Sequence, residues 1–254
     1  MNRKIIGILV SILFFGAGIV SAVNINVEST KMIKDIENPN PDIKTFNPTD
    51  DVSIKEATPN ANYGSSYLVV RNRYGGFGQP GYEDDILIKF DISELSSGVT
   101  IISATLNLFY YKWSENFPVG RPLTLYRITS DWDEAIVTWN TRPSYNTAVT
   151  SMATVPSSPN VWVEWDVTSD VEIFVKGQEI NYGWQIMDET YWGMFDIPAT
   201  WFHQKEYSGN GDEYIPYLEI EFTTSRNKDI TNQFFLQFLE RFPLLNRFLT
   251  LLID

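Results

Sequence analysis

The sequence predicts an all-β fold: a single jelly-roll-like β-sandwich with one short helix, followed by a C-terminal amphipathic helical tail. Short runs rich in β-branched and aromatic residues follow one another through the middle of the chain, each bounded by Gly, Pro, Asn or Asp. Two of these runs, residues 105–110 and 217–222, alternate apolar and polar side chains, as a strand with one buried face does. The composition, 43% hydrophobic and 20% charged in 254 residues, is that of a globular domain.

The first 22 residues have the three parts of a secretory signal. Arg3 and Lys4 form a basic start, residues 5–20 are apolar, and residues 20–22 (Val-Ser-Ala) are small enough for cleavage. We therefore expect cleavage after residue 22 and a secreted, extracellular protein, associated with the cell surface or free of it. An uncleaved N-terminal anchor is the alternative, because the apolar run approaches the roughly 17 to 20 residues that span a bilayer.

Residues 23–49 mix Asn, Pro and charged residues without sustained periodicity, which predicts a linker. The β-sandwich domain is expected over residues 50–224. A helix is expected at residues 168–177, because Thr168 or its neighbour can cap the start and Gly177 can end it. No internal repeat is visible, so we expect one domain. Its predicted strands are residues 52–57, 66–71, 85–91, 100–113, 121–129, 161–167, 182–187, 199–206 and 214–223.

The pattern changes near Arg226, where strand-like alternation gives way to helical spacing. Charged residues lie too centrally in this amphipathic helical tail, residues 225–254, for a membrane span. We expect the tail to dock on the domain, or to associate through residues 229–253 with a membrane surface or with other copies of the chain. The apolar residues at helical spacing before Pro243 are Phe234, Phe235, Phe238, Leu239 and Phe242.

A motif in the middle of the domain indicates a family. Residues 130–134 read Ser-Asp-Trp-Asp-Glu, and Val-Thr-Trp-Asn follows at residues 137–140, with Pro143 after it. This pattern resembles the "dWdE..vTWn..P" hallmark of DNRLRE domains, also called disaggregatase-related repeats, which are classed with carbohydrate-binding module family 96. The resemblance covers about residues 50 to 224, because further motifs of the family follow in order at residues 62–64, 87–93, 102–106, 165–168 and 181–183.

The resemblance implies a secreted, non-catalytic β-sandwich that binds extracellular or cell-surface polysaccharide, including uronate-containing polymers. One departure bears on the ligand, because the family's closing Ser-Arg-Glu reads Gln204-Lys205-Glu206 here. Lysine keeps the positive charge but lacks the planar fork that pairs with a carboxylate in bidentate fashion. The tail, with its Leu-Glu-Arg-Phe-Pro core, resembles the short tails of some secreted archaeal proteins and indicates an archaeal source.

We predict the polysaccharide site mainly in loops outside the hallmark motifs. Aromatic rings beside glycine or charged residues are suited to stacking on sugars, and basic side chains are suited to pairing with carboxylates. A neutral glycan is as compatible with the sequence as an acidic one. Trp132 and Trp139 are expected to be buried, with ligand contact as the alternative. The candidate binding residues are Arg71, Arg73, Tyr74, Tyr82, Trp113, Tyr191, Trp192 and Lys205.

Asp131, Asp133 and Glu134 are candidate oxygen ligands for Ca²⁺, although their spacing is not that of a calcium loop and surface acidity is the alternative. The chain has no Cys and one His, which disfavours a thiolate metal site or a catalytic triad, and its net charge of −13 disfavours nucleic acid. We therefore expect that the chain is not an enzyme. A structural cell-surface or matrix protein, assembled or anchored through its tail, is the alternative, and a glycoside hydrolase or lyase is a minor one.

Overall fold

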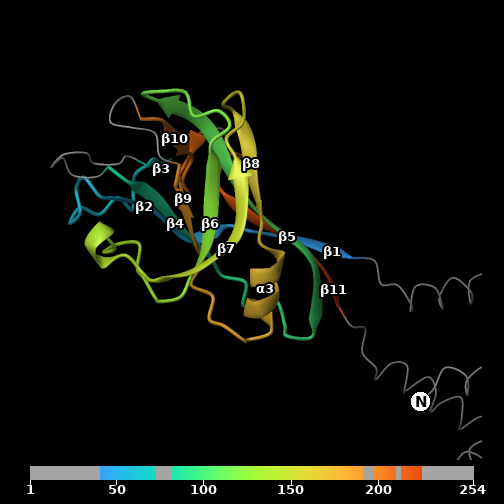
Figure 1. Cartoon of the computed structure of the whole chain (residues 1–254). Coiled ribbons are helices and arrows are strands. Elements are labelled where there is room, and N and C mark those ends of the chain that lie inside the picture. The colour runs from blue at the N-terminus through green and yellow to red at the C-terminus, as the bar shows by residue number, and fades with distance from the viewer. Residues whose placement is uncertain (1–40, 73–81, 191–196, 210–212, 225–254) are drawn as a thin grey trace, which may run out of the picture. The chain divides into compact units, whose positions relative to one another are not determined.

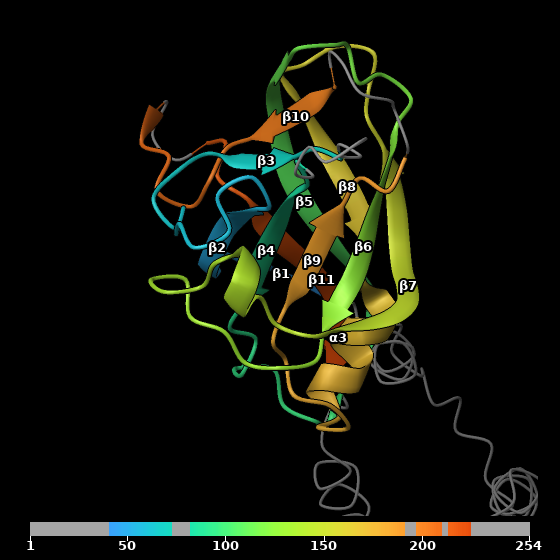
Figure 2. The same ribbon diagram turned by 60° about the vertical axis from the view of Figure 1, so that its left-hand side comes forward.

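Two antiparallel β-sheets face each other in the computed structural model, which describes residues 41–72, 82–190, 197–209 and 213–224 (Figure 1). The turned view shows strands of sheet B in front of strands of sheet A (Figure 2). Sheet A consists of β1 (Asp42–Phe46), β3 (Leu68–Val70), β5 (Val99–Ser114), β8 (Val161–Asp166), β10 (Ala199–Phe202) and β11 (Tyr217–Thr224). Sheet B consists of β2 (Pro48–Lys55), β4 (Asp84–Phe90), β6 (Pro122–Ile128), β7 (Tyr145–Thr154) and β9 (Trp184–Met187).

The 16-residue strand β5 connects the other strands of sheet A. Along one edge it pairs with β11 over residues 99–107 and then with β10 over residues 110–114. Along the opposite edge it pairs with β8 over residues 105–110. Strand β1 pairs with β11, and β3 pairs with β10, so both depend on β5 for their place in the sheet.

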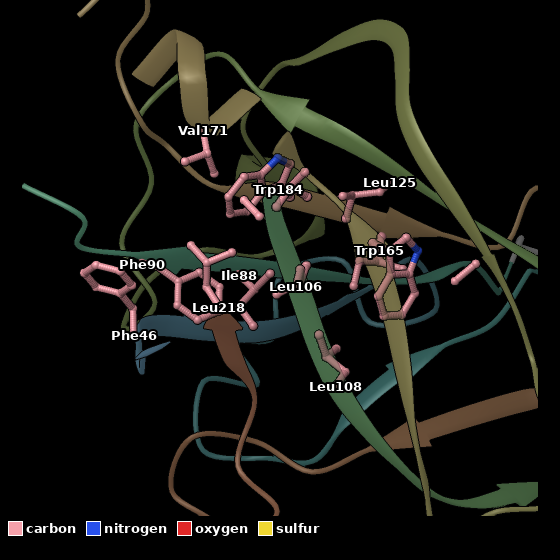
Figure 3. Packing of buried hydrophobic residues seen from close by; sticks show 14 of the residues in the cluster. Phe46, Ile88, Phe90, Leu106, Leu108, Leu125, Trp165, Val171, Trp184 and Leu218 are labelled. Atoms are coloured by element: carbon pink, nitrogen blue, oxygen red, sulfur yellow. The ribbon is translucent and has the colours of Figure 1, made fainter. Parts of the chain in front are cut away.

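The main apolar core lies between the sheets and takes alternate residues of the strands. Leu106 and Leu108 of β5 are fully buried there, together with the two large rings of Trp165 and Trp184 (Figure 3). A buried indole N–H needs an acceptor, and Nε1 of Trp165 donates to the backbone oxygen of Leu123 at 3.0 Å. The core therefore fixes these rings by hydrogen bonds as well as by packing.

Helix α3 (Thr168–Val175) closes one end of the sandwich, with Val171 packed in the core beside Trp184 (Figure 3). Asp170 in its first turn accepts the Nε1–H of Trp184 at 2.9 Å. The predicted cap is wrong, because Val167 occupies the N-cap position and provides no side-chain cap. The Thr168 hydroxyl instead accepts a backbone N–H of β5 at 2.9 Å, which ties the helix to sheet A.

A second apolar cluster lies on the outer face of sheet B. The loop at residues 129–143, which includes the short 3-10 helix η1 (Trp139–Thr141), supplies part of it. Trp132 and Trp139 are 7% and 9% exposed, so the prediction that both are buried is confirmed. Nε1 of Trp132 donates to the backbone oxygen of Tyr182 at 2.8 Å. The cluster consists of Val52, Ile54, Leu87, Ile128, Trp132, Val137 and Trp139.

The predicted β-sandwich with one short helix is confirmed, and each predicted strand overlaps an observed one. Two strands were not predicted. Strand β1 lies within residues 23–49, so the linker prediction is wrong for residues 42–46 and for the start of β2. No regular structure was predicted for residues 145–154, which form strand β7. Each of these two strands buries only one side chain, Phe46 in β1 and Ala153 in β7, so neither shows the alternation of a half-buried strand.

The jelly-roll connectivity stays a prediction. The predicted signal at residues 1–22 and the predicted helical tail at residues 225–254 lie outside the described residues. Within the described ranges, no helix is both long and apolar enough to span a membrane.

Two glycines in left-handed conformation provide a matched test of the packing between β4 and the turn before β9. A Cβ at Gly183 (φ +80°) would lie 2.0 Å from the backbone oxygen of Ile88, whereas a Cβ at Gly177 (φ +65°) would meet no atom within 4 Å. We expect Gly177→Ala to lower the free energy of unfolding by about 1 to 2 kcal/mol. Gly183→Ala should lower it by about 3 kcal/mol or more, because strain and a backbone clash add. Urea unfolding of both variants measures the difference, and equal losses would contradict the close approach.

Candidate functional site

The outer face of sheet A, on the side away from the core, carries a continuous group of aromatic rings. In β5, Phe109 and Tyr111 alternate with core residues and therefore point outward. Trp162 of β8 is the register partner of Phe109, and Trp201 of β10 lies across from the end of β5. We call this group the aromatic face; its members are Tyr67, Phe109, Tyr111, Trp162, Trp201, His203, Tyr207, Tyr214 and Tyr217.

One end of the aromatic face is basic. The Lys112 ammonium lies 4.3 Å from the ring centroid of Trp201, 5.4 Å from that of Tyr111 and 5.7 Å from that of Tyr67. Tyr67 is 48% exposed, and Lys112 is exposed as well. Cation–π attraction holds the ammonium over the rings while leaving it open to solvent.

A β-bulge places Lys112 beside Tyr111. Trp201 pairs with Lys112 while the next residue of β10, Phe202, pairs with Tyr110, so Tyr111 is the extra residue of the bulge. An extra residue in one strand lets two consecutive side chains share a side of the sheet. The bulge therefore adds a positive charge to a face that is otherwise aromatic.

His203 lies at the centre of the aromatic face, between stacked rings. Its ring centroid is 3.7 Å from that of Tyr207, 4.3 Å from that of Tyr111 and 5.6 Å from that of Phe109. The residue is 6% exposed, and burial lowers the pKa of the imidazole below its ordinary value. A neutral imidazole is therefore the expected form at pH 7, and it packs as one more flat ring.

The other end of the aromatic face is acidic. Phe109 stacks on Tyr214 with centroids 4.2 Å apart and meets Trp162 edge to face at 5.2 Å. Trp162 in turn meets Tyr217 at 4.9 Å. Beyond these rings the same strands expose Glu164 of β8 and other carboxylates.

This arrangement has the chemistry of a sugar-binding surface. An aromatic ring offers an apolar face to the C–H groups of a pyranose, while tyrosine hydroxyls and the lysine ammonium offer hydrogen bonds to its hydroxyls or carboxylate. A row of rings along a sheet is suited to an extended chain of sugars. The described residues show no arrangement on this face that would activate a nucleophile, since its histidine is buried and packed by rings.

The predicted basic binding residues are engaged elsewhere. Arg71 pairs with Asp84 at 3.0 Å and with Glu115 at 2.7 Å, so its guanidinium is neutralised within the protein. Lys205 pairs with Glu134 at 2.9 Å and also with Glu206, so its ammonium is engaged by carboxylates within the protein. The structure does not bring these two residues together.

Of the predicted aromatic binding residues, Trp113 lies apart from the aromatic face. Trp113 is 41% exposed, but it pairs in register with the buried Thr200, on the opposite side of the sheet from Trp201 and Lys112. Its ring packs on Phe117 at 5.2 Å. Tyr82 is half-buried next to β4. The remaining candidates, Arg73, Tyr74, Tyr191 and Trp192, lie outside the described residues.

Sequence reasoning missed the aromatic face, although a signal for it was present. Phe109 and Tyr111 alternate with apolar core residues within a predicted strand, and Trp201 and His203 do the same in another. Aromatic residues on the outward sides of several strands can form a contiguous patch, which marks a candidate binding surface. The site was predicted in loops, where binding residues are common, and not on the outward sides of strands.

The predicted calcium ligands separate in the structure. Oδ1 of Asp131 accepts the N–H of Trp132 at 3.0 Å, and Oδ1 of Asp133 accepts the N–H of Ala135 at 2.8 Å, so both form local turns. Glu134 instead joins two acids that were not predicted. One carboxylate oxygen each of Asp51, Glu134 and Glu206 lies within 4.8 Å of the others, and we call these residues the acidic cluster.

Burial determines the electrostatics of the acidic cluster. Asp51 is 1% exposed, and the pKa of its carboxyl is raised to about 7, chiefly by burial and also by the nearby Glu134 carboxylate, against the lowering effect of the Lys205 backbone N–H. Burial also raises the pKa of Glu134, against the lowering effect of the Lys205 ammonium. Both carboxylates therefore favour either a proton or a closer positive charge.

Comparison with known proteins shows two similarities. Residues 42–214 match the model of "Carbohydrate-binding module family 96", which is more than half of the chain. A "Gellan lyase" from Bacillus sp is 27% identical over 123 residues, which are 47% of this chain. The chain spans only 5% of the length of that lyase. The family match begins at the first residue of β1 and includes most of the aromatic face, and it shows that this chain belongs to carbohydrate-binding module family 96.

Proposed function

We propose that this chain is a secreted, non-catalytic domain that binds extracellular or cell-surface polysaccharide along the aromatic face of sheet A. The observation that carries the proposal is the row of rings from Tyr67, just before β3, to Tyr217 of β11, which runs over β5, β10 and β8. Membership of a carbohydrate-binding family supports it. The signal-like pattern of residues 1–22 supports export.

The proposed ligand includes uronate-containing polymers. Lys112 supports this, because its exposed ammonium lies over three rings and can pair with a carboxylate of a sugar stacked beside it. The acidic far end of the aromatic face and the net charge of −13 oppose long-range attraction of a polyanion. Recognition of an acidic sugar would therefore depend on local pairing with Lys112.

The lyase alternative comes from the relative named gellan lyase, of which this chain covers 5%. A match to so small a share of a long protein is typical of an accessory module, and we propose that the catalytic function lies elsewhere in that protein. Purified full chain incubated with polygalacturonate or alginate should release no new chain ends. Cleavage that Glu134→Gln abolishes would favour the lyase instead.

The first binding test removes rings from the aromatic face. Trp201→Ala and Tyr67→Ala should each weaken polysaccharide binding about tenfold, equivalent to about 1.4 kcal/mol, because each removes a stacking surface. Isothermal titration calorimetry and affinity electrophoresis with acidic and neutral polysaccharides measure the change. We expect wild-type dissociation constants between about 1 μM and 1 mM, as shallow and partly wet contacts give.

Trp113→Ala is the control, because Trp113 is an exposed tryptophan on the opposite side of sheet A. It should leave binding unchanged. A large loss in Trp113→Ala together with normal binding in Trp201→Ala would move the site to the predicted loops and overturn the assignment to the aromatic face.

The second binding test removes the positive charge of the aromatic face. Lys112→Met should weaken binding of polygalacturonate about three- to tenfold and leave a neutral glucan unaffected, because only the acidic polymer pairs with the ammonium. The loss should shrink as salt is raised from 20 to 500 mM, since salt screens an exposed pair. Lys176→Met, which removes the exposed lysine at the C-cap of α3, is the control. Equal losses for the acidic and neutral polymers would count against a uronate ligand.

A further inference from the structure

The acidic cluster joins three segments that are far apart in the sequence. Asp51 belongs to β2 at the edge of sheet B, Glu134 to the loop that covers the second apolar cluster, and Glu206 to the turn after β10. One carboxylate oxygen of each lies within 4.8 Å of the others. The environment ranges from fully buried at Asp51 to exposed at Glu206, so the cluster has a closed inner side and an open outer side.

One oxygen of the buried carboxylate has no partner. Oδ2 of Asp51 accepts the backbone N–H of Lys205 at 2.7 Å, but Oδ1 has no hydrogen-bond partner among the residues that the structure describes. At 1% exposure, Asp51 has little contact with bulk water. An unpaired buried carboxylate oxygen is costly, and proteins satisfy such atoms by a donor or by a cation.

The charges of the cluster are unbalanced. The ammonium of Lys205 pairs with Glu134 at 2.9 Å and with Glu206, and among the described residues it is the one positive group paired with these three carboxylates. Nearby, Asp50 adds a further acid, which is already paired with Lys89 at 3.2 Å. The Lys205 side chain is one-fifth exposed, so its flexible stem can carry the ammonium outward without unfolding the backbone.

We propose that Asp51, Glu134 and Glu206 bind a divalent cation, which by its ligand chemistry is Ca²⁺, and that the ion displaces the ammonium of Lys205 toward solvent. The three ligands offer only oxygen atoms, which hard cations prefer. Calcium accepts six to eight oxygens in irregular geometry and can complete its shell with water on the open side. Magnesium requires a near-octahedral shell and loses its water reluctantly, so it fits this loose arrangement less well.

The ion would connect the acidic cluster to the aromatic face. Glu206 is followed by Tyr207, whose ring stacks on His203 at 3.7 Å in the centre of that face. Fixing Glu206 against Asp51 would hold this turn, and with it the Tyr207 ring, in the stacked position. Polysaccharide binding should therefore depend on calcium. This consequence rests on the proposed function, whereas the cation site itself does not.

The test uses the full chain after treatment with EDTA and dialysis, titrated with CaCl₂ or MgCl₂ in the absence of any glycan. We expect one calcium per chain, with a dissociation constant on the order of 10⁻⁴ to 10⁻³ M as in extracellular modules, and a melting temperature that rises with calcium concentration. Magnesium should bind at least tenfold more weakly. An absence of calcium binding in wild type overturns the proposal, and an equal response to magnesium overturns the assignment to calcium.

Variants locate the site. Glu206→Gln, at an exposed position that tolerates change, and Asp51→Asn should each abolish the calcium response. Asp133→Asn is the control, because asparagine keeps the oxygen that accepts the Ala135 N–H, and it removes one of the calcium ligands predicted from sequence. Retention of calcium binding in Glu206→Gln, or its loss in Asp133→Asn, places the ion elsewhere and overturns the proposal.

The variant Lys205→Gln distinguishes a metal site, in which calcium displaces the ammonium, from a permanent internal ion pair. If calcium competes with the ammonium, this variant should bind calcium at least fivefold more tightly, because the competitor is gone. If Lys205 is the permanent counter-ion of the cluster, the variant should be less stable and unresponsive to calcium, which overturns the proposal. Polysaccharide binding measured separately on the same samples shows whether the proposed function stands when the cation site fails.

Discussion

The alternation of side chains along β5 is the constraint on which the rest of the structure depends. Within a few residues the strand sends Leu106, Leu108 and Tyr110 into the core and Phe109 and Tyr111 to the opposite side. The same strand forms backbone hydrogen bonds with β11, β10 and β8. A shift of one residue in its register would exchange the two sets of side chains, so the stability of the core and the presence of the aromatic face are coupled.

Much of the fold could be predicted from the sequence, for a physical reason. Strands that bury one face must alternate, so β5 and β11 were recognisable from their residues alone. The strands β1 and β7 were not, because each buries a single side chain and is held in the sheet by backbone hydrogen bonds with its neighbour. Backbone pairing carries no signature in the order of side chains, so such strands appear in a sequence as loops.

The aromatic face could be predicted only in pieces. Each strand shows its own outward ring, but the register between strands determines which rings touch. The bulge in β5 is an example, because strict alternation would place Lys112 and Tyr111 on opposite sides of the sheet. The acidic cluster has the same origin: Glu134 was recognisable as an acid in a hallmark motif, but Asp51 and Glu206 meet it only through the packing of three distant segments.

The two sheets use their outer faces differently, and this difference explains why the hallmark motif does not mark the proposed ligand site. On sheet B, Trp132 and Trp139 of the motif cover Val52, Ile54 and Leu87, so that face is already occupied by the chain itself. On sheet A, within the part of the chain that the structure describes, the outward rings stack on one another, and Tyr67, Trp162 and Trp201 among them remain at least partly exposed. The tryptophans of the motif therefore maintain the architecture, whereas the proposed binding surface is built from sheet A residues outside the motif. If the sugar binds there, as we propose, substitutions at Tyr67, Lys112 or Trp201 would change the binding surface without disturbing either core.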